Sequence, residues 1–512
     1  MEENRSYKNP KRIAKNTAYL YIRMIILLII SLYSSRLVLK ELGITDYGIY
    51  NVIGGFITIF SFINGSMSQA SQRFITYELG RGDLTALRNI FSTCVYIHIA
   101  LAALIAILGE TIGLWYVYNI AIIPADRFYA ALWVYHCSII VSCASIITVP
   151  YNALIIAHEC MAAFSYLAII EAILKLAIVF LLMVIPFDNL IVYGVLMAIL
   201  AILMRIFYGI YASRTFSESK LIRKLDVVSL KSMGSYAGWS LCGSMAAAGY
   251  SQGLNLLINA FFNPAVNAAR GVAVTVQGVI RNFSNNFQVA VNPQITKSFA
   301  ACDISYMHSI IYRASVLSFY LFFLLALPVW LEIDTLLRLW LVDVPQNTAT
   351  FIRILLIISS IELLSSPLNV SAQATGKIKA YELSTSCILL LIIPLAYIAL
   401  LVYPKPEIVF EVFLMQVVFA HAVKIILLKF KIGLSIGKYF REVLIRIMIV
   451  FAIAIIIPTY IHILMPQGVL RLVCVGLSSV LYTPCIIFLL GLNKNEKKMV
   501  TSKLAQMLHK QK

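Results

Sequence analysis

The sequence predicts an all-α polytopic membrane protein with about 14 transmembrane helices. Of its 512 residues, 61% are hydrophobic and only 12% are charged, and the mean hydropathy is +0.88. This composition is far more apolar than that of a soluble domain. The apolar residues also gather in runs long enough to cross a bilayer as helices, which takes about 20 residues each. The connections between the runs are short, so no loop has room for a folded domain outside the membrane.

Each predicted helix is one of these apolar runs. They cover residues 15–39, 47–70, 86–109, 128–149, 163–185, 189–211, 232–260, 265–291, 306–330, 349–370, 382–402, 408–428, 441–460 and 469–491.

The chain repeats itself once. A gapless alignment of the chain with itself pairs Asp83 with Asp303, and a slightly shorter offset further along pairs Ala157 with Ala374. We call these the first and the second repeat alignment. Each copy holds six helices, an even number, so both copies enter the membrane from the same side and the repeat is parallel.

We therefore predict two pseudo-symmetric six-helix lobes followed by a C-terminal helix pair. The predicted domains are an N-terminal lobe at 1–218, a C-terminal lobe at 219–430, and an extra helix pair with a basic cytoplasmic tail at 431–512.

Positive charge marks one side of the predicted bundle. The formal net charge is +18, and the large clusters of Lys and Arg lie at 5–15, 214–231, 429–441 and 494–512. With an even number of helices, all of these clusters fall on one side, which the positive-inside rule identifies as cytoplasmic. Both termini are therefore predicted to be cytoplasmic. The charge reports topology, and we expect no binding of nucleic acid.

A line of polar residues crosses the eighth predicted helix. Its members recur at steps of three, four, seven or eight, which places them on one helical face. They are Asn267, Arg270, Gln277, Arg281, Asn285, Gln288 and Asn292.

This polar face is unsuited to lipid. Arg270 and Arg281 are eleven residues apart, or about 16 Å along a helix, so at least one lies deep in the membrane. A bare Arg there costs about 3 to 15 kcal/mol. The face either packs against neighbouring helices or lines a water-filled cavity that holds an anion. Two arginines with several amides are more than packing needs, which favours the cavity.

Other charges also fall within predicted helices. Arg23 either reaches the cytoplasmic surface or faces the cavity. Glu171 and Lys175 are spaced i,i+4 with the acid first, which favours an internal pair. Glu362 is a lone acid that is either hydrogen-bonded in the bundle or a proton carrier. The candidate substrate-binding residues are Arg281, Arg270, Gln277, Asn285, Gln288, Arg23 and Lys175, and the candidates for ion coupling are Glu171 and Glu362.

The sequence offers no pattern for covalent chemistry. It contains no P-loop and no Ser/His/Asp arrangement, and its histidines lack metal-ligand spacing. The nine cysteines form no CxxC pair and are interpreted as small buried apolar residues. We therefore predict that the protein is not an enzyme and that it needs no cofactor or metal.

Several short motifs resemble a known family. They are LGITDYGIY at 42–50, SQRF at 71–74, GRGD at 80–83, PYNAL at 150–154 and AQATGK at 372–377. These motifs resemble those of lipid-linked oligosaccharide flippases, including O-antigen flippases, which belong to the multidrug/oligosaccharidyl-lipid/polysaccharide exporter superfamily. The resemblance covers most of the chain. Its motifs indicate the superfamily well and the substrate poorly.

The resemblance implies a fold and an activity. The fold would have two six-helix lobes in a V around a cationic central cavity. The activity would be the flipping of a polyprenyl-pyrophosphate-linked oligosaccharide, such as an O-antigen repeat unit of lipopolysaccharide, across a bacterial inner membrane by alternating access. Two extra C-terminal helices in such relatives are thought to guide the lipid tail, and 441–491 matches them. Membrane lipids, a polysaccharide polymerase and the export machinery are the implied partners.

Two other functions remain as alternatives. A multidrug or ion antiporter of the same superfamily should have an acidic cavity, whereas this chain has Arg23 where drug-exporting relatives carry an acid in helix one. A membrane glycan polymerase or ligase would need a sizeable outer loop with catalytic residues. The longest outer loop, near 331–348, is too short for that.

The first testable prediction concerns topology. The charge asymmetry places the 213–231 loop in the cytoplasm, so a cysteine introduced as Lys220→Cys in a cysteine-free background should not react with a membrane-impermeant maleimide in intact cells. Lys405→Cys, on the predicted outer side, is the matched control and should react. Labelling of residue 220 in intact cells would show that the topology is the reverse of the predicted one.

Overall fold

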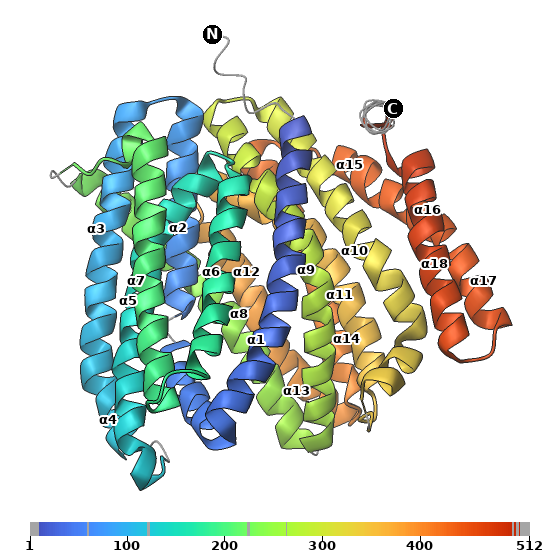
Figure 1. Cartoon of the computed structure of the whole chain (residues 1–512). Helices are drawn as coiled ribbons and strands as arrows, with labels where there is room; N and C mark the ends of the chain where they lie inside the picture. Colours follow the sequence, from blue (N-terminus) through green and yellow to red (C-terminus); the bar gives the residue numbers. More distant parts are fainter. Residues whose placement is uncertain are drawn as a thin grey trace, which may run out of the picture. The chain divides into compact units, whose positions relative to one another are not determined.

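A computed structural model describes residues 10–58, 61–119, 123–222, 226–262, 264–341, 343–493, 496–497 and 501 (Figure 1). All regular secondary structure in these residues is helical, which confirms the predicted all-α class. In chain order the α-helices are α1 (Pro10–Thr58), α2 (Ser61–Arg81), α3 (Leu84–Leu108), α4 (Leu114–Asn119), α5 (Phe128–Ala157), α6 (Met161–Leu182), α7 (Asn189–Thr215), α8 (Val227–Phe261), α9 (Pro264–Ala300), α10 (Ile304–Trp340), α11 (Thr348–Ala374), α12 (Lys379–Leu390), α13 (Ile392–Val402), α14 (Glu407–Ile432), α15 (Ile436–Tyr439), α16 (Arg446–Ala454), α17 (Ile456–Leu464) and α18 (Val469–Ile486).

The predicted helices and the observed ones correspond, with local differences. Helix α1 runs through the first predicted helix into the second, and its direction changes at Gly43, which has φ 74° and ψ 172°. Glycine populates a positive φ at little cost, so it marks this kink. The eleventh predicted helix consists of α12 and α13, and the thirteenth consists of α15 to α17 with a π-helical turn at Phe440–Ile445.

Eleven helical segments among the described residues are long and apolar enough to cross a membrane. The predicted segments 232–260 and 265–291 are helical, as α8 and α9, but are not among the eleven. Helix α8 is rich in small residues and α9 carries the polar face, so both are less apolar than a lipid-facing span. The predicted segment 47–70 is also absent from the eleven, and it lies partly outside the described residues.

Backbone conformation supports the internal repeat. Gly82 and Cys302, equivalent in the first repeat alignment, have φ values of 75° and 57°. Glu159 and Gly376, equivalent in the second, have φ values of 60° and 74°. Left-handed backbone is uncommon outside glycine. Its recurrence at matching turns shows that both copies end these helices in the same way.

The chain forms two compact units. The first unit comprises Met1–Met245, Val289–Asp303 and Gln373–Glu382, and the second comprises Ala246–Gln288, Ile304–Ala372 and Leu383–Lys512. The predicted lobe boundaries at 218 and 430 follow from the repeat rather than from contacts, and they stay predictions.

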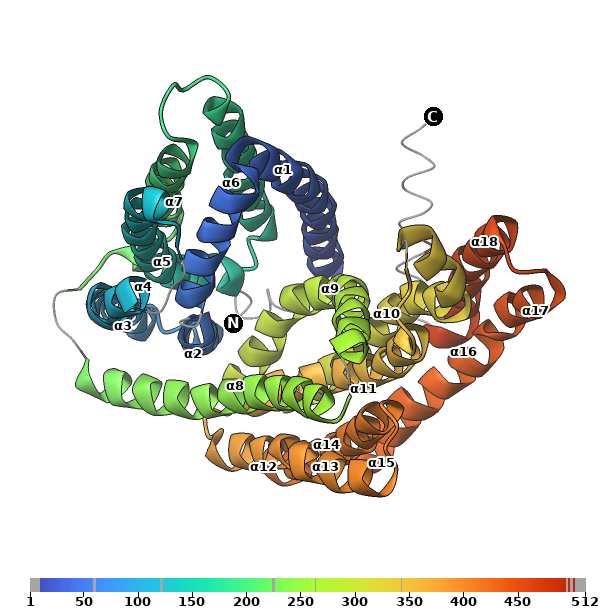
Figure 2. The same ribbon diagram turned by 90° about the horizontal axis from the view of Figure 1, so that it is seen from below.

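In the first unit, α3, α5 and α7 lie side by side (Figures 1 and 2). Their contact surfaces enclose fully buried apolar side chains, among them Phe91, Val134, Tyr135 and Leu154. Apolar packing of this kind holds the helices together in a close-packed interior.

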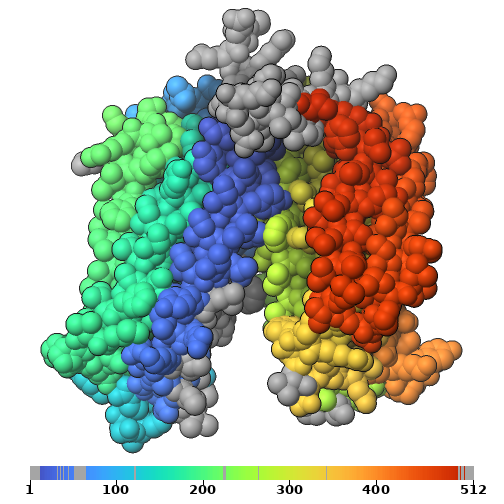
Figure 3. All heavy atoms as spheres, turned by 45° about the vertical axis from the view of Figure 1, so that its right-hand side comes forward, coloured from blue at the N-terminus to red at the C-terminus, as the bar shows by residue number. Residues whose placement is uncertain are grey.

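In the second unit, a buried carboxylate fixes the C-terminal helices to α10. Glu332 is fully buried, and Arg471 of α18 and His462 of α17 both approach it to 2.7 Å. The Thr335 hydroxyl donates a further hydrogen bond of 2.9 Å. A buried carboxylate is tolerated when its partners satisfy it in this way. The attached helices α16 to α18 form one band of the surface, drawn in red (Figure 3).

Arg127 connects three helices of the first unit. Its guanidinium donates to Asp46 in the kinked end of α1 (2.7 Å) and to Asp188, the N-cap residue of α7 (2.5 Å). Burial opposes ionisation of Asp188, but the hydrogen bond from Arg127 and those from backbone amides outweigh it and hold the pKa of Asp188 below its usual range.

The second testable prediction follows from this cluster. Arg127→Ala should lower the thermal unfolding midpoint of the detergent-solubilised protein at pH 7, and Arg127→Lys should lower it less because Lys keeps the charge but loses the forked geometry. A carboxylate whose pKa is lower in the folded protein than in the unfolded chain, where it is about 4, stabilises the fold at a pH above that unfolded value. This stabilisation is lost as the pH falls through the folded pKa. The difference between wild type and Arg127→Ala should therefore shrink below about pH 4. A difference that does not depend on pH would argue against the ionic origin.

Candidate functional site

The polar face of α9 in the second unit is centred on an ion pair. Arg281 Nη1 lies 2.5 Å from Glu362 Oε2 of α11, and the two side chains are 36% and 20% exposed. The sequence suggested a cavity arginine and a lone acid; the structure brings them together. The pair is neutral as a unit, and it is only partly buried.

On either side of Arg281, two glutamines of this face form hydrogen bonds with neighbouring helices. Gln277 Nε2 donates to Ser359 Oγ of α11 at 2.6 Å. Gln288 is only 4% exposed and donates to Ser318 Oγ at 3.1 Å and to the Leu363 carbonyl at 3.2 Å. In this conformation Gln288 therefore serves helix packing, so substrate contact by its amide stays a prediction. Asn285 lies between these two glutamines in the sequence, and its side chain is half-buried.

Arg270 differs from Arg281 because no carboxylate neutralises it within the part of the chain that the structure describes. Its Nη2 donates to the Ser251 carbonyl of α8 at 2.8 Å, and its side chain is half-buried. Arginine stays protonated in proteins, so this position carries a net positive charge. The second unit thus holds one neutralised and one uncompensated arginine on the same face of α9.

The first unit contains a polar cavity of about 540 Å³. Glu171 and Lys175 of α6 line it and are joined by an ion pair of 2.7 Å, which confirms the predicted i,i+4 pair. Uncharged polar side chains from α2, α5 and α7 complete its polar lining: Ser68, Ser145, Thr148, Asn152 and Tyr208. The cavity therefore offers many hydrogen-bonding groups with no net charge from its single ion pair.

Arg23 is not one of the residues that line this cavity. Its guanidinium lies 4.5 Å from the ring centre of Phe164 of α6. Both alternatives for Arg23, the cytoplasmic surface and the central cavity, stay predictions.

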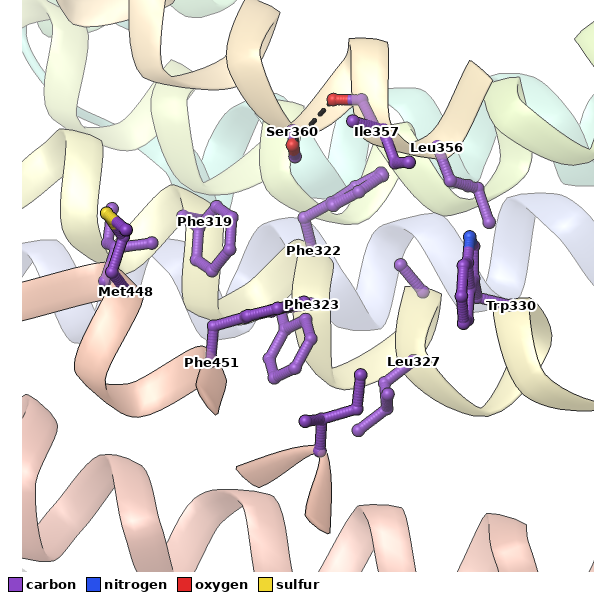
Figure 4. Close-up of a pocket in the computed structure, with 13 residues that line it drawn as sticks. Phe319, Phe322, Phe323, Leu327, Trp330, Leu356, Ile357, Ser360, Met448 and Phe451 are labelled. Atoms are coloured by element: carbon purple, nitrogen blue, oxygen red, sulfur yellow. Dashed lines mark hydrogen bonds between the residues drawn. The ribbon is translucent and has the colours of Figure 1, made fainter. Parts of the chain in front are cut away.

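An apolar groove was not foreseen from the sequence. It has a volume of about 350 Å³ and lies in the second unit between α10, α11 and α16. Figure 4 shows the aromatic rings of Phe319, Phe322, Phe323 and Trp330 on α10 with Met448 and Phe451 of α16. Met448 and Phe451 are substantially exposed, so the groove opens to the outside of the unit. No sequence period distinguishes such a groove from ordinary helix packing.

The described residues contain no group of three or more His, Cys, Asp or Glu side chains placed to hold a metal ion.

No protein-family model matches the chain, and no curated protein matches it. Solved structures do match. The structure of MATE in complex with MaD3S is 11% identical with a TM-score of 0.71, covering 85% of this chain and 98% of the other. An outward-facing multidrug resistance MATE family transporter of the MOP superfamily is 11% identical with a TM-score of 0.71, covering 83% and 96%. The MATE transporter ClbM in complex with Rb⁺ is 14% identical with a TM-score of 0.68, covering 84% and 97%.

At these identities the similarity shows the fold, and this chain has the two-lobed fold of MATE transporters. The superfamily named for one of these structures is the one that the sequence motifs resemble.

The third testable prediction separates pairing from any other role of Arg281. Removing one member of a buried ion pair costs about 3–5 kcal/mol, and partial exposure should reduce that cost here. Arg281→Ala should therefore lower the amount of folded protein in the membrane and its thermal midpoint. The neutral double variant Arg281→Gln/Glu362→Gln should recover most of both losses, because no charge is left without a partner. A double variant as unstable as Arg281→Ala would show that the pair is not what Arg281 provides to the fold.

Proposed function

We propose that this protein is a transporter that flips a polyprenyl-pyrophosphate-linked oligosaccharide across the cytoplasmic membrane by alternating access. The observation that carries the proposal is the arginine-bearing face of α9, with Arg270 uncompensated and Arg281 partly exposed. A net positive charge at membrane depth is costly, and an anionic substrate offsets that cost whenever it binds.

The pyrophosphate is the group that this face suits. Arginine binds phosphate oxygens through two parallel N–H donors, a geometry that lysine lacks. Arg270 would hold one phosphate directly. Arg281 would exchange its Glu362 partner for the second phosphate, so that the carboxylate keeps the guanidinium in place between transport cycles. In this mechanism Glu362 is a positioning residue for Arg281.

The sugars suit the cavity of the first unit. Neutral sugar hydroxyls need many donors and acceptors and no net charge. The Glu171–Lys175 pair with Asn152, Thr148 and Tyr208 supplies such a lining. Lys175 would add donors for acidic sugars or phosphate, and so would Arg23 if it faces the central cavity.

The polyprenyl tail suits the groove between α10, α11 and α16. The tail is a branched hydrocarbon, and the groove is lined by aromatic and aliphatic side chains and opens outward, toward the surrounding lipid in this proposal. Burial of apolar surface there contributes about 25 cal/mol for each Å² removed from water. The tail would stay in the groove or in lipid while the head group crosses.

Localisation in a bacterial inner membrane with both termini in the cytoplasm, and cooperation with a polymerase and the export machinery, belong to the same proposal. They rest on the sequence resemblance and on the distribution of positive charge.

A multidrug or ion antiporter is the second candidate. The matched MATE structures fit it equally well, and Glu171 and Glu362 are membrane acids of the kind that bind cations or protons. Each of these acids, however, is already neutralised by an internal cation, Lys175 or Arg281. A cationic drug would have to displace that cation, which favours the anionic substrate. Ion coupling through either acid stays a prediction.

The fourth testable prediction compares export with abundance in the same cells. Arg270→Ala should reduce surface glycan per transporter at least about tenfold, because a hydrogen bond to a charged group contributes about 1.5–3 kcal/mol. Arg270→Lys should retain part of the activity. Arg281→Gln/Glu362→Gln should restore the protein level but not the export.

The matched control is Arg214→Ala, which removes an exposed charge at the end of α7. It should leave export unchanged. Normal glycan per transporter in Arg270→Ala and in the double variant would remove both arginines from the substrate path. Loss of drug resistance with intact glycan would favour the antiporter.

A further inference from the structure

In the first unit, the C-terminal ends of α2 and α9 touch each other at equivalent positions of the repeat. A Cβ atom added at Gly80 of α2 would lie 2.8 Å from Lys297 Cα and 2.9 Å from Ala300 Cβ of α9. The first repeat alignment pairs Gly80 with Ala300, so equivalent positions of the two copies touch each other. Equivalent positions can touch only where the pseudo-two-fold axis passes. Glycine is required there because any side chain at residue 80 would collide with the backbone of α9.

An ion pair lies on one side of this contact. Lys297 Nζ of α9 is 2.8 Å from Glu159 Oε1 in the turn between α5 and α6, and both side chains are buried. Gln294 Nε2 donates to the same carboxylate at 3.3 Å, and Arg12 Nε approaches it to 3.4 Å. Asn16 fixes the turn by donating to the Glu159 carbonyl at 3.0 Å.

A related contact lies on the other side. Arg73 Nη2 of α2 donates to the Ala374 carbonyl at 3.0 Å, and the guanidinium stacks 4.6 Å from the ring centre of Tyr77. The turn that Arg73 reaches contains Gly376, the repeat equivalent of Glu159. The first repeat alignment pairs Lys297 with Tyr77, one helical turn after Arg73. In each copy, then, a cation on the second helix binds the turn that follows the fourth helix of the other copy.

We propose that these two symmetry-related latches, Glu159–Lys297 and Arg73–Ala374, form a gate that closes the cytoplasmic end of the transport path. All of these residues lie at the end of the helices that the charge pattern assigns to the cytoplasm. The proposal does not depend on the substrate, because it concerns only the opening of the path.

The physical properties of the latch suit a gate. A buried ion pair gains little net stability over its two hydrated ions, because desolvation offsets the attraction. Several donors to the Glu159 carboxylate hold the latch closed. When the latch opens, the charged groups of Glu159 and Lys297 would both regain water at the membrane surface. The closed and open states can therefore differ by a small free energy, as a two-state element requires.

The test is a cross-link between Tyr77→Cys and Phe299→Cys, because these rings lie 6.4 Å apart at the same contact and Gly80 itself stays unchanged. A background without native cysteines is needed, because Cys302 is near Phe299 in the sequence. A protease site introduced after Lys220 makes the disulfide visible, since the two fragments stay joined only while they are cross-linked. Oxidation should join the fragments, reduction should release them, and neither single cysteine variant should show a cross-link.

Opening is measured without any substrate. A cysteine at Ser68, which lines the cavity of the first unit, should react with an impermeant maleimide from the cytoplasmic face of inside-out vesicles. Labelling should be blocked in the oxidised, cross-linked protein and return on reduction. Glu159→Gln should raise the labelling rate severalfold and lower the cross-link yield, whereas the cytoplasmic-loop control Asp226→Asn should change neither.

Failure of this cysteine pair to cross-link in a monodisperse protein would overturn the contact. Equal labelling of residue 68 in the cross-linked and reduced protein would overturn its role as a gate. Neither outcome depends on glycan export, so the gate and the proposed substrate are tested separately.

Discussion

A charged group within a membrane needs a partner, and this constraint organises the structure. Isolated ions lose several kcal/mol when they leave water, so pairing or hydrogen bonding has to compensate. The acids that lie within or at the ends of the helices meet this need in several places: Glu171 with Lys175, Glu362 with Arg281, Glu332 with Arg471 and His462, and Glu159 with Lys297. Each of the last three pairs also joins helices that are distant in sequence, so the same contacts that satisfy the charges determine the packing of the helices.

The ion pairs differ in burial. A buried pair can only hold helices together, whereas a partly exposed pair can also exchange one partner for a ligand. Glu332 is fully buried, and Arg471, His462 and Thr335 all contact its carboxylate, so this carboxylate is closed to another ligand. The Arg281–Glu362 pair is partly exposed, so either member can accept a new partner at lower cost. Arg270, with only a carbonyl acceptor from the protein, has the greatest capacity left for an anion. Availability to a ligand from outside the protein therefore increases from the buried Glu332 carboxylate to the Arg281–Glu362 pair, and then to Arg270.

Local sequence patterns predicted the helices, the repeat and the Glu171–Lys175 pair, because helical periodicity and an i,i+4 spacing specify them directly. Arg281 and Glu362 are 81 residues apart, and Glu159 and Lys297 are 138 apart, so no local pattern relates them. Periodicity also placed Gln288 correctly on the polar face of α9 but could not say which neighbour covers it. The structure covers it with α10 and α11, while Arg281, two turns earlier, stays partly open. The apolar groove depends on the spacing between three helices, which the sequence does not encode locally.

The repeat explains the fold, but the charges lie where the two copies differ. The first repeat alignment pairs Arg281 with Ser61, and the second pairs Glu362 with Ser145, so the first copy has two serines where the second has an ion pair. Conversely, Glu171 and Lys175 correspond to Ile388 and Ile392. Each copy thus has a charged pair where the other copy has none, whereas the turns at Glu159 and Gly376 have a common backbone conformation. The copies share the backbone of these turns but not the charged pairs. A site built from unshared residues would be asymmetric, as the proposed head group, with a phosphate end and a sugar end, would require.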